Sequence, residues 1–171
     1  MLDAGMKAPD FSLPGIVDGQ PDFYDLHLHV GRGSAAMLVW FPADFMPRVT
    51  DDLRALSAAG WHDREDLVVW GISGDSLFAH QAYAEREGIA FPLLSDTHST
   101  IADAYAAVYE EFRGQPAVPE YGVCAVGTDW TVLYGWGAED PFADHGGEPF
   151  ERAREELGAA LDADLAPVRR E

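Results

Sequence analysis

The sequence predicts an α/β sandwich in which helices flank a mixed central sheet. Two strongly apolar runs, residues 35–41 and 66–73, are typical of central strands that are covered on both faces. Between the strand-like runs lie segments whose apolar residues recur at helical spacing. Because such alternation favours a sheet packed against helices, we expect a layer of strands with helices on its faces.

The expected elements follow one another in the order β-β-β-α-β-α-β-α-β-β-α. Strands are predicted at residues 10–15, 23–30, 35–41, 66–73, 91–96, 121–127 and 130–136, and helices at residues 47–59, 75–88, 98–109 and 148–165. The two earliest strands alternate apolar and polar side chains, which indicates one buried face each. The helices place apolar side chains three or four residues apart, which indicates one face toward the core.

Turn and capping residues support these boundaries. Pro14 and Gly15 indicate a turn after the first strand. Gly60 and Gly88 stand just past two of the predicted helices, where a left-handed residue ends a helix. The hairpin near the end of the chain is expected to turn at Thr128 and Asp129, while the helix at 75–88 begins with Asp75 or Ser76 as its cap. No linker divides the chain, so we expect one domain over residues 1–171.

The charge of the chain excludes several functions. It carries 30 Asp and Glu against 11 Lys and Arg, a formal net charge of −19, and Lys7 is its only lysine. Such a surface repels phosphate backbones and anionic lipids, so we expect no nucleic-acid or membrane partner. Concentrated salt screens this self-repulsion, which favours a salt-rich cytoplasm; an ordinary acidic protein from a high-GC genome is the alternative. No signal peptide is recognisable, and we expect a cytoplasmic location.

Four segments, taken in order, resemble one known family. They read "APDFSLPG", "LVWFPADFMPRVTDDL", "VVWGISGDSLFAHQAYAEREGIAFPLLSD" and "YGVCAVGTDWTVLYGW". In sequence and spacing they resemble the peroxiredoxins of the alkyl hydroperoxide reductase/thiol-specific antioxidant group. The resemblance covers residues 5–137 and is followed by the predicted helix at 148–165. It implies a thioredoxin-like sandwich of peroxiredoxin type.

The resemblance also implies where the family's chemistry lies. Peroxiredoxins carry a segment P-x-x-x-T-x-x-C at the start of the first long helix and an arginine from a later strand. The helix N-terminus and the arginine lower the pKa of the cysteine, and the resulting thiolate attacks the peroxide. In this sequence Pro42 matches the proline, Met46 stands at the threonine position and Val49 at the cysteine position. The arginine position falls on Tyr121, or on Glu120 if the register shifts by one.

The sequence therefore predicts that this peroxidase site is vestigial. Valine has no nucleophile, and methionine cannot donate a hydrogen bond to a peroxide. The only cysteine, Cys124, lies in an apolar strand, where we expect a buried and inert thiol. We expect a non-catalytic binding or interaction protein. The alternative is a thiol-dependent oxidoreductase that uses Cys124, or a site repurposed around Asp44, Arg48 and Tyr121.

Other polar residues have ordinary explanations that compete with functional ones. His27 and His29 alternate on the predicted strand 23–30, so they could supply two metal ligands, although an exposed polar face is the simpler explanation. A third ligand cannot be assigned from spacing; the candidates are Asp25, His62, His80 and His98. We expect no metal site, and no cofactor, because no nucleotide-binding fingerprint is present.

The start of the helix at 47–59 carries the remaining candidates. Asp44, Asp51 and Asp52 complement the positive end of a helix dipole, and Arg48 is expected to pair with Asp51 or Asp52. Phe45, Met46 and Arg48 lie on the loop that borders a dimer contact in many relatives, so this surface is the expected interface of a possible homodimer.

Overall fold

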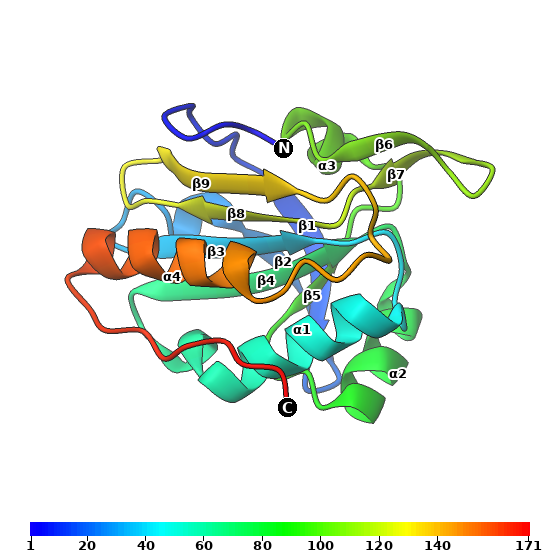
Figure 1. The fold of residues 1–171 in the computed structure, drawn as a ribbon, viewed down its shortest axis with the longest axis horizontal. Helices are drawn as coiled ribbons and strands as arrows, with labels where there is room; N and C mark the ends of the chain where they lie inside the picture. The colour runs from blue at the N-terminus through cyan, green and yellow to red at the C-terminus, as the bar shows by residue number, and fades with distance from the viewer.

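The computed structural model describes residues 1–171 and contains one large sheet (Figure 1). Its strands lie in the order β2-β1-β5-β4-β3-β8-β9. The bounds are β1 (Ser12–Val17), β2 (Gln20–Asp25), β3 (Ala35–Trp40), β4 (Leu67–Ser73), β5 (Leu93–Ser95), β8 (Gly122–Val126) and β9 (Val132–Gly137). β3, β4 and β5 are parallel, and the outer pairs are antiparallel. The predicted α/β sandwich with a mixed sheet is confirmed.

The middle strand β3 is buried along its whole length, as its apolar run predicts. Alternate side chains of a strand point to opposite faces. Met37 and Val39 therefore belong to one core cluster, whereas Leu38 and Trp40 belong to the other. The sheet thus divides the apolar interior into two cores, and each candidate site residue lies on one side or the other.

Helices α1 (Pro47–Ala59), α2 (Leu77–Glu87) and α4 (Glu148–Leu161) cover one face of the sheet. The N-terminal segment and the short α3 (Thr100–Ala104) contribute to the core on the other face. Gly60 and Gly88 end α1 and α2 with positive φ, and the Ser76 side chain caps α2. The predicted roles of Gly60, Gly88 and Ser76 at the helix ends are confirmed. None of the helices combines the length and hydropathy needed to cross a bilayer.

Three sequence-based expectations are wrong. Residues 23–30 do not form one strand, because β2 ends at Asp25 and a 3-10 turn, η1 (Leu26–Leu28), follows. Pro14 and Gly15 lie inside β1, which turns into β2 at Asp18 and Gly19 instead. The predicted helix at 98–109 shrinks to α3. Beyond it lies a hairpin that was not predicted, formed by β6 (Val108–Phe112) and β7 (Gln115–Pro119).

The chain ends in a segment without helix or strand, residues 162–171, which we call the C-terminal strap. It leaves α4 at Asp162, whose φ of 49° reverses the chain direction, and it runs back toward α1 (Figure 1). Leu165 is buried in the core beneath α1 and α4. The indole Nε1 of Trp61 donates to the Ala166 carbonyl over 2.8 Å. The strap is thereby held against the same face of the sheet as α1.

Candidate functional site

The loop between β3 and α1 places apolar side chains in the core. Pro42 is buried, and Met46 is the residue just before the first turn of α1, with no side-chain hydrogen bond to the helix. Met46 is 9% exposed and Val49 is 0% exposed. Both belong to the core cluster on the α1 side of the sheet. The positions that the resemblance assigns to the threonine and the cysteine therefore carry buried thioether and hydrocarbon groups.

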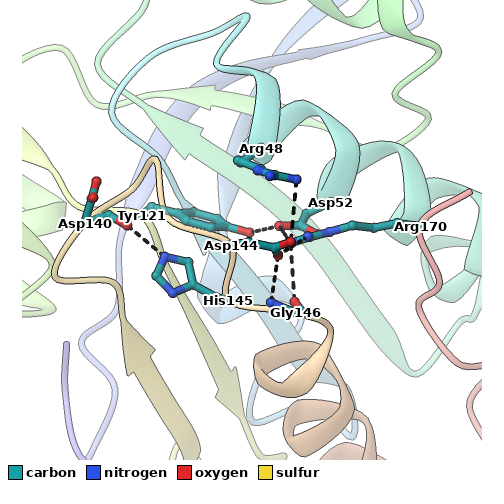
Figure 2. A network of polar contacts seen from close by, with 8 residues as sticks. All are labelled: Arg48, Asp52, Tyr121, Asp140, Asp144, His145, Gly146 and Arg170. Atoms are coloured by element: carbon teal, nitrogen blue, oxygen red, sulfur yellow. Dashed lines mark hydrogen bonds and ion pairs between the residues drawn. The ribbon is translucent and has the colours of Figure 1, made fainter.

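One turn along α1 a polar network begins at Asp52 (Figure 2). The residue is only 2% exposed, yet both carboxylate oxygens have partners. The Tyr121 hydroxyl donates to Oδ2. The Arg170 side chain, from the C-terminal strap, donates from Nε to Oδ1 over 2.5 Å and from Nη2 to Oδ2 over 3.0 Å. A fork of two parallel bonds is the strongest geometry for an arginine–carboxylate pair.

Arg170 also joins the network to the loop before α4. Its Nη1 donates to Asp144 over 2.6 Å, and its Nη2 to the Gly146 carbonyl over 3.3 Å. Arg48 lies 3.7 Å from the same Asp144 carboxylate. The backbone N–H of Gly146, followed by the Arg170 guanidinium, lowers the pKa of Asp144. These contacts raise the pKa of Arg170 further above its usual range, led by the hydrogen bond to Asp52.

Tyr121 forms the aromatic wall of this site. Its ring meets Trp136 edge-on at 5.6 Å between centroids, and Trp136 meets His145 at 4.8 Å. The His145 ring nitrogen Nε2 donates to the Asp140 carbonyl over 2.8 Å. Burial, and then the nearby Asp52 carboxylate, raise the pKa of Tyr121 well above its ordinary value. The phenol is therefore a neutral hydrogen-bond donor at physiological pH.

A second buried pair ties the loop before α1 to α2. The Nδ1 atom of His80 lies 2.9 Å from Asp44 Oδ2, and its Nε2 lies 3.0 Å from the Leu94 carbonyl. Because a carbonyl only accepts, Nε2 carries a proton, and a second proton is shared between Nδ1 and the carboxylate. Burial raises the pKa of Asp44, opposed by its bond to His80. Both side chains are fully committed to each other and to the backbone.

The geometry sets out what the site can do. Asp52 already accepts three donors, so it is not free to act as a general base. The one hydroxyl in the first turn of α1, that of Thr50, is buried and hydrogen-bonded to the Tyr83 hydroxyl at 2.8 Å. The network instead holds a planar guanidinium through all of its nitrogens, a geometry that an ammonium group cannot reproduce. In the structure these residues hold the guanidinium of the chain's own Arg170.

The structure gives several candidate residues partners that the sequence did not predict. Tyr121 faces the site, whereas Glu120, its alternative, is turned away and pairs with the N-terminal ammonium at 3.1 Å. Arg48 pairs with Asp144 rather than with Asp51 or Asp52. Asp44 and Asp52 do not act as helix-end charges, because tertiary partners engage both. Of the expected interface, Phe45 is 43% exposed, but Met46 is buried and offers no surface.

Cys124 lies on the other side of the sheet. It is 0% exposed in β8 and packs with the core opposite α1, whereas Val49 and Tyr121 belong to the α1 side. Burial raises the pKa of its thiol to about 12. The expectation of a buried cysteine is confirmed in the structure, and the thiol does not reach the first turn of α1.

The histidine pair does not form a ligand set. His27 lies on the 3-10 turn and His29 directly after it, where His27 is 3.5 Å from Asp10 and His29 packs on Trp70. The strand geometry that would align them is absent. The structure contains no group of three or more His, Cys, Asp or Glu side chains placed to hold a metal ion.

Sequence reasoning missed Arg170, Asp144 and the Asp44–His80 pair. The two ends of the Asp52–Arg170 contact are 118 residues apart, and those of the Asp44–His80 contact are 36 apart. No local sequence pattern predicts such contacts. The one signal in the sequence was Tyr121, which stands where the resemblance places an arginine. A carboxylate near that position would need a cation from elsewhere in the chain.

Comparisons with known proteins agree with this architecture. Residues 4–132 match the AhpC/TSA family. A putative peroxiredoxin, bcp, from Coxiella burnetii is 30% identical over 118 residues, which cover 66% of this chain and 72% of the relative. The putative peroxiredoxin sll0755 from Synechocystis is 34% identical over 118 residues, which cover 61% of this chain and only 56% of the relative.

Solved structures show the same fold. The reduced 2-Cys peroxiredoxin of Plasmodium vivax superposes with a TM-score of 0.77 at 19% identity, over 93% of this chain and 82% of that one. The peroxidoxin BcpB of Mycobacterium tuberculosis gives 0.72 at 22% identity, over 91% and 98%. These likenesses define a thioredoxin-like sandwich of peroxiredoxin type, as the sequence predicts. With the match over residues 4–132, the chain belongs to the AhpC/TSA family.

The Asp44–His80 pair gives a first prediction. His80→Leu leaves a buried carboxyl without its partner, and we expect a loss of about 3–5 kcal/mol in unfolding free energy. For a chain of this size the melting temperature falls by roughly 6–20 °C. Thermal and urea unfolding measure the effect. His98→Leu, at an exposed histidine, is the control and should change little. A double variant Asp44→Leu/His80→Leu that is no more stable than His80→Leu contradicts this explanation.

The burial of Cys124 gives a second prediction. Because its pKa is about 12, almost no thiolate exists at neutral pH, and the sulfur is shielded from reagents. A disulfide reagent should label the native protein hardly at all at pH 7 to 9 and label it completely in denaturant. Rapid labelling of one thiol per native chain contradicts the packing of β8.

Proposed function

We propose that this chain is a member of its family without peroxidase activity and that it acts as a non-catalytic binding protein. The observation that carries the proposal is the position of Val49. A fully buried hydrocarbon side chain stands in the first turn of α1, where the resemblance expects the oxidisable sulfur. Peroxide reduction by the family's route begins with a thiolate, and valine cannot provide one.

Two further features support the proposal. Met46, at the threonine position, is buried and has no O–H or N–H group that could donate a hydrogen bond to a peroxide. Tyr121, at the arginine position, presents a neutral phenol that is already donating to Asp52. The alternative of an enzyme based on Cys124 gains no support, because that thiol faces the opposite core. The alternative of an enzyme based on Asp44, Arg48 and Tyr121 also gains no support. These side chains contact His80, Asp144 and Asp52 respectively, and not one another.

The third prediction tests the loss of peroxidase chemistry. With a dithiol reductant, the unmodified protein should consume hydrogen peroxide or an alkyl hydroperoxide no faster than a blank. Val49→Cys alone should remain feeble, because positioning and charge stabilisation act together. Adding Met46→Thr and Tyr121→Arg should raise the rate by about a hundredfold or more, the typical effect of restoring such donors.

Two results would contradict the proposal or its reasoning. Turnover by the unmodified chain that disappears in Cys124→Ala would establish a thiol enzyme. Full activity in Val49→Cys alone would show that Met46 and Tyr121 do not limit the reaction. Circular dichroism of each variant separates inactive chemistry from misfolding.

We also propose that the protein works in a salt-rich cytoplasm. Its net charge of −19 is spread over 171 residues, and ten of its eleven basic residues are arginines. Self-repulsion on this scale destabilises a compact state at low ionic strength. Potassium chloride at cytoplasmic concentrations in halophiles reduces the Debye length to about 3 Å and removes most of that repulsion.

We propose in addition that a homodimer forms through the surface around Phe45 and Arg48. Phe45 has a φ of 64° and projects from the loop before α1. Its ring packs 4.8 Å from Tyr83 and lies under the Arg86 guanidinium. An ordered, half-exposed aromatic ring beside a cation is a common feature of protein interfaces.

The fourth prediction uses one melting experiment for both proposals. The melting temperature should rise by several degrees between about 0.1 M and about 2 M KCl, with most of the gain below about 1 M. At a fixed salt concentration it should also rise with protein concentration, because dimerisation stabilises the native state by mass action. Phe45→Asp should remove the second effect and leave the first. A melting temperature that is independent of salt contradicts salt adaptation, and one that is independent of protein concentration contradicts the dimer.

A further inference from the structure

The C-terminal strap occupies the site in the manner of an extended peptide ligand. It has no helix or strand. Apart from the contacts of Arg170, it is held where Trp61 donates to the Ala166 carbonyl, where Arg154 donates to the Leu165 carbonyl over 3.1 Å, and where Arg154 pairs with Asp164 at 3.6 Å. Leu165 is buried in the core on the α1 side of the sheet, and the half-buried Val168 packs against that core. Arg170 then delivers its guanidinium to Asp52.

The receiving pocket is built for a guanidinium group. Asp52 contributes a buried carboxylate that is oriented from behind by the Tyr121 hydroxyl. Asp144 accepts from Nη1 and the Gly146 carbonyl accepts from Nη2 of Arg170. Nε, Nη1 and Nη2 thus all have acceptors (Figure 2). Planar, forked recognition of this kind distinguishes arginine from lysine.

The charge of the pocket requires an occupant. Asp52 and Asp144 bring two carboxylates together in a chain whose net charge is −19. Arg48, at 3.7 Å from Asp144, approaches only the outer carboxylate. Without Arg170 the buried Asp52 has a phenol and no cation. The pocket therefore attracts a cationic side chain, whether that side chain belongs to the strap or to another protein.

We propose that this pocket, with the surface that the strap covers, is a binding site for an extended partner segment that carries arginine, and that the C-terminal strap is its built-in occupant. The strap defines the fitting pattern: apolar residues five and two positions before the arginine, as Leu165 and Val168 stand before Arg170. A partner segment displaces the strap and takes over its contacts. The inference deepens the proposed binding role and rests on it.

The strap also explains why the site is closed in the isolated chain. Only seven residues separate Arg170 from Asp162 at the end of α4, so the effective concentration of Arg170 at the pocket is in the millimolar range. A free peptide of similar affinity cannot compete with it at ordinary concentrations. Weakening the strap within the full chain should therefore open the site to a peptide added from outside.

The fifth prediction tests this site with a labelled peptide that has the sequence of residues 164–171. Fluorescence anisotropy should show binding to the full-length Arg170→Gln variant at least about tenfold tighter than to the unmodified protein. Replacing the peptide's own Arg170-equivalent with Gln should abolish the gain. Adding Asp52→Asn to Arg170→Gln should also abolish it. Arg169→Gln, next to Arg170 but outside the network, is the matched control and should behave as the unmodified chain does.

Arg170→Lys is a second variant in case Arg170→Gln does not fold. It keeps a cation beside Asp52 but removes the two parallel hydrogen bonds of the guanidinium. It should also bind the peptide more tightly than the unmodified chain does. Equal binding of the arginine and glutamine peptides, or no binding to either folded variant, overturns the inference. The unmodified protein could instead form a dimer without added peptide, and Arg170→Gln could abolish that dimer. This result would show that the pocket binds the strap of a second copy, and it would also overturn the inference. Peroxide turnover by the unmodified chain contradicts the proposed function instead, and is measured separately.

Discussion

The buried carboxylate of Asp52 is the constraint on which this side of the molecule depends. An ionised group that is 2% exposed requires a cation and hydrogen-bond donors, or its burial costs several kcal/mol. Tyr121 supplies a donor and Arg170 supplies the cation. One carboxylate therefore holds together α1, the start of β8 and the C-terminal strap, three segments that are distant in the sequence. The loop before α4 joins them through Asp144.

The side chain at position 121 determines what else this network needs. A tyrosine at position 121 can donate one hydrogen bond to Asp52, but it cannot neutralise the carboxylate. The cation must then come from elsewhere, and the strap provides it. Val49, three residues before Asp52 and so on the same face of α1, packs with Met46 in the core. Apolar packing and an ion pair therefore adjoin along this face of the helix.

Local sequence patterns predicted those elements whose structure depends on neighbouring residues in the chain. The apolar run of β3, the left-handed glycines after α1 and α2, and the family motifs all identified their elements correctly. The alternation at residues 23–30 misled, because Leu26 is buried from a 3-10 turn rather than from a strand. The β6–β7 hairpin carries two prolines and exposed glutamates, which hid its pairing. Asp44 and Asp52 suggested helix-end charges, but their partners lie in other elements and no spacing rule could reveal them.

The topology of β8 separates the thiol of Cys124 from the first turn of α1. Side chains along a strand alternate between faces, so Val123 and Ala125 point toward α1 while Cys124 points into the opposite core. A rotamer change cannot carry the thiol through the sheet. A shift of β8 by one residue against β3 and β9 could move the thiol to the α1 side. Such a shift would turn every side chain of β8 to the opposite face of the sheet and disrupt both cores. The sheet therefore keeps Cys124 apart from α1 whatever conformation the surface loops adopt, and sulfur chemistry at that helix requires a new side chain on the helix itself.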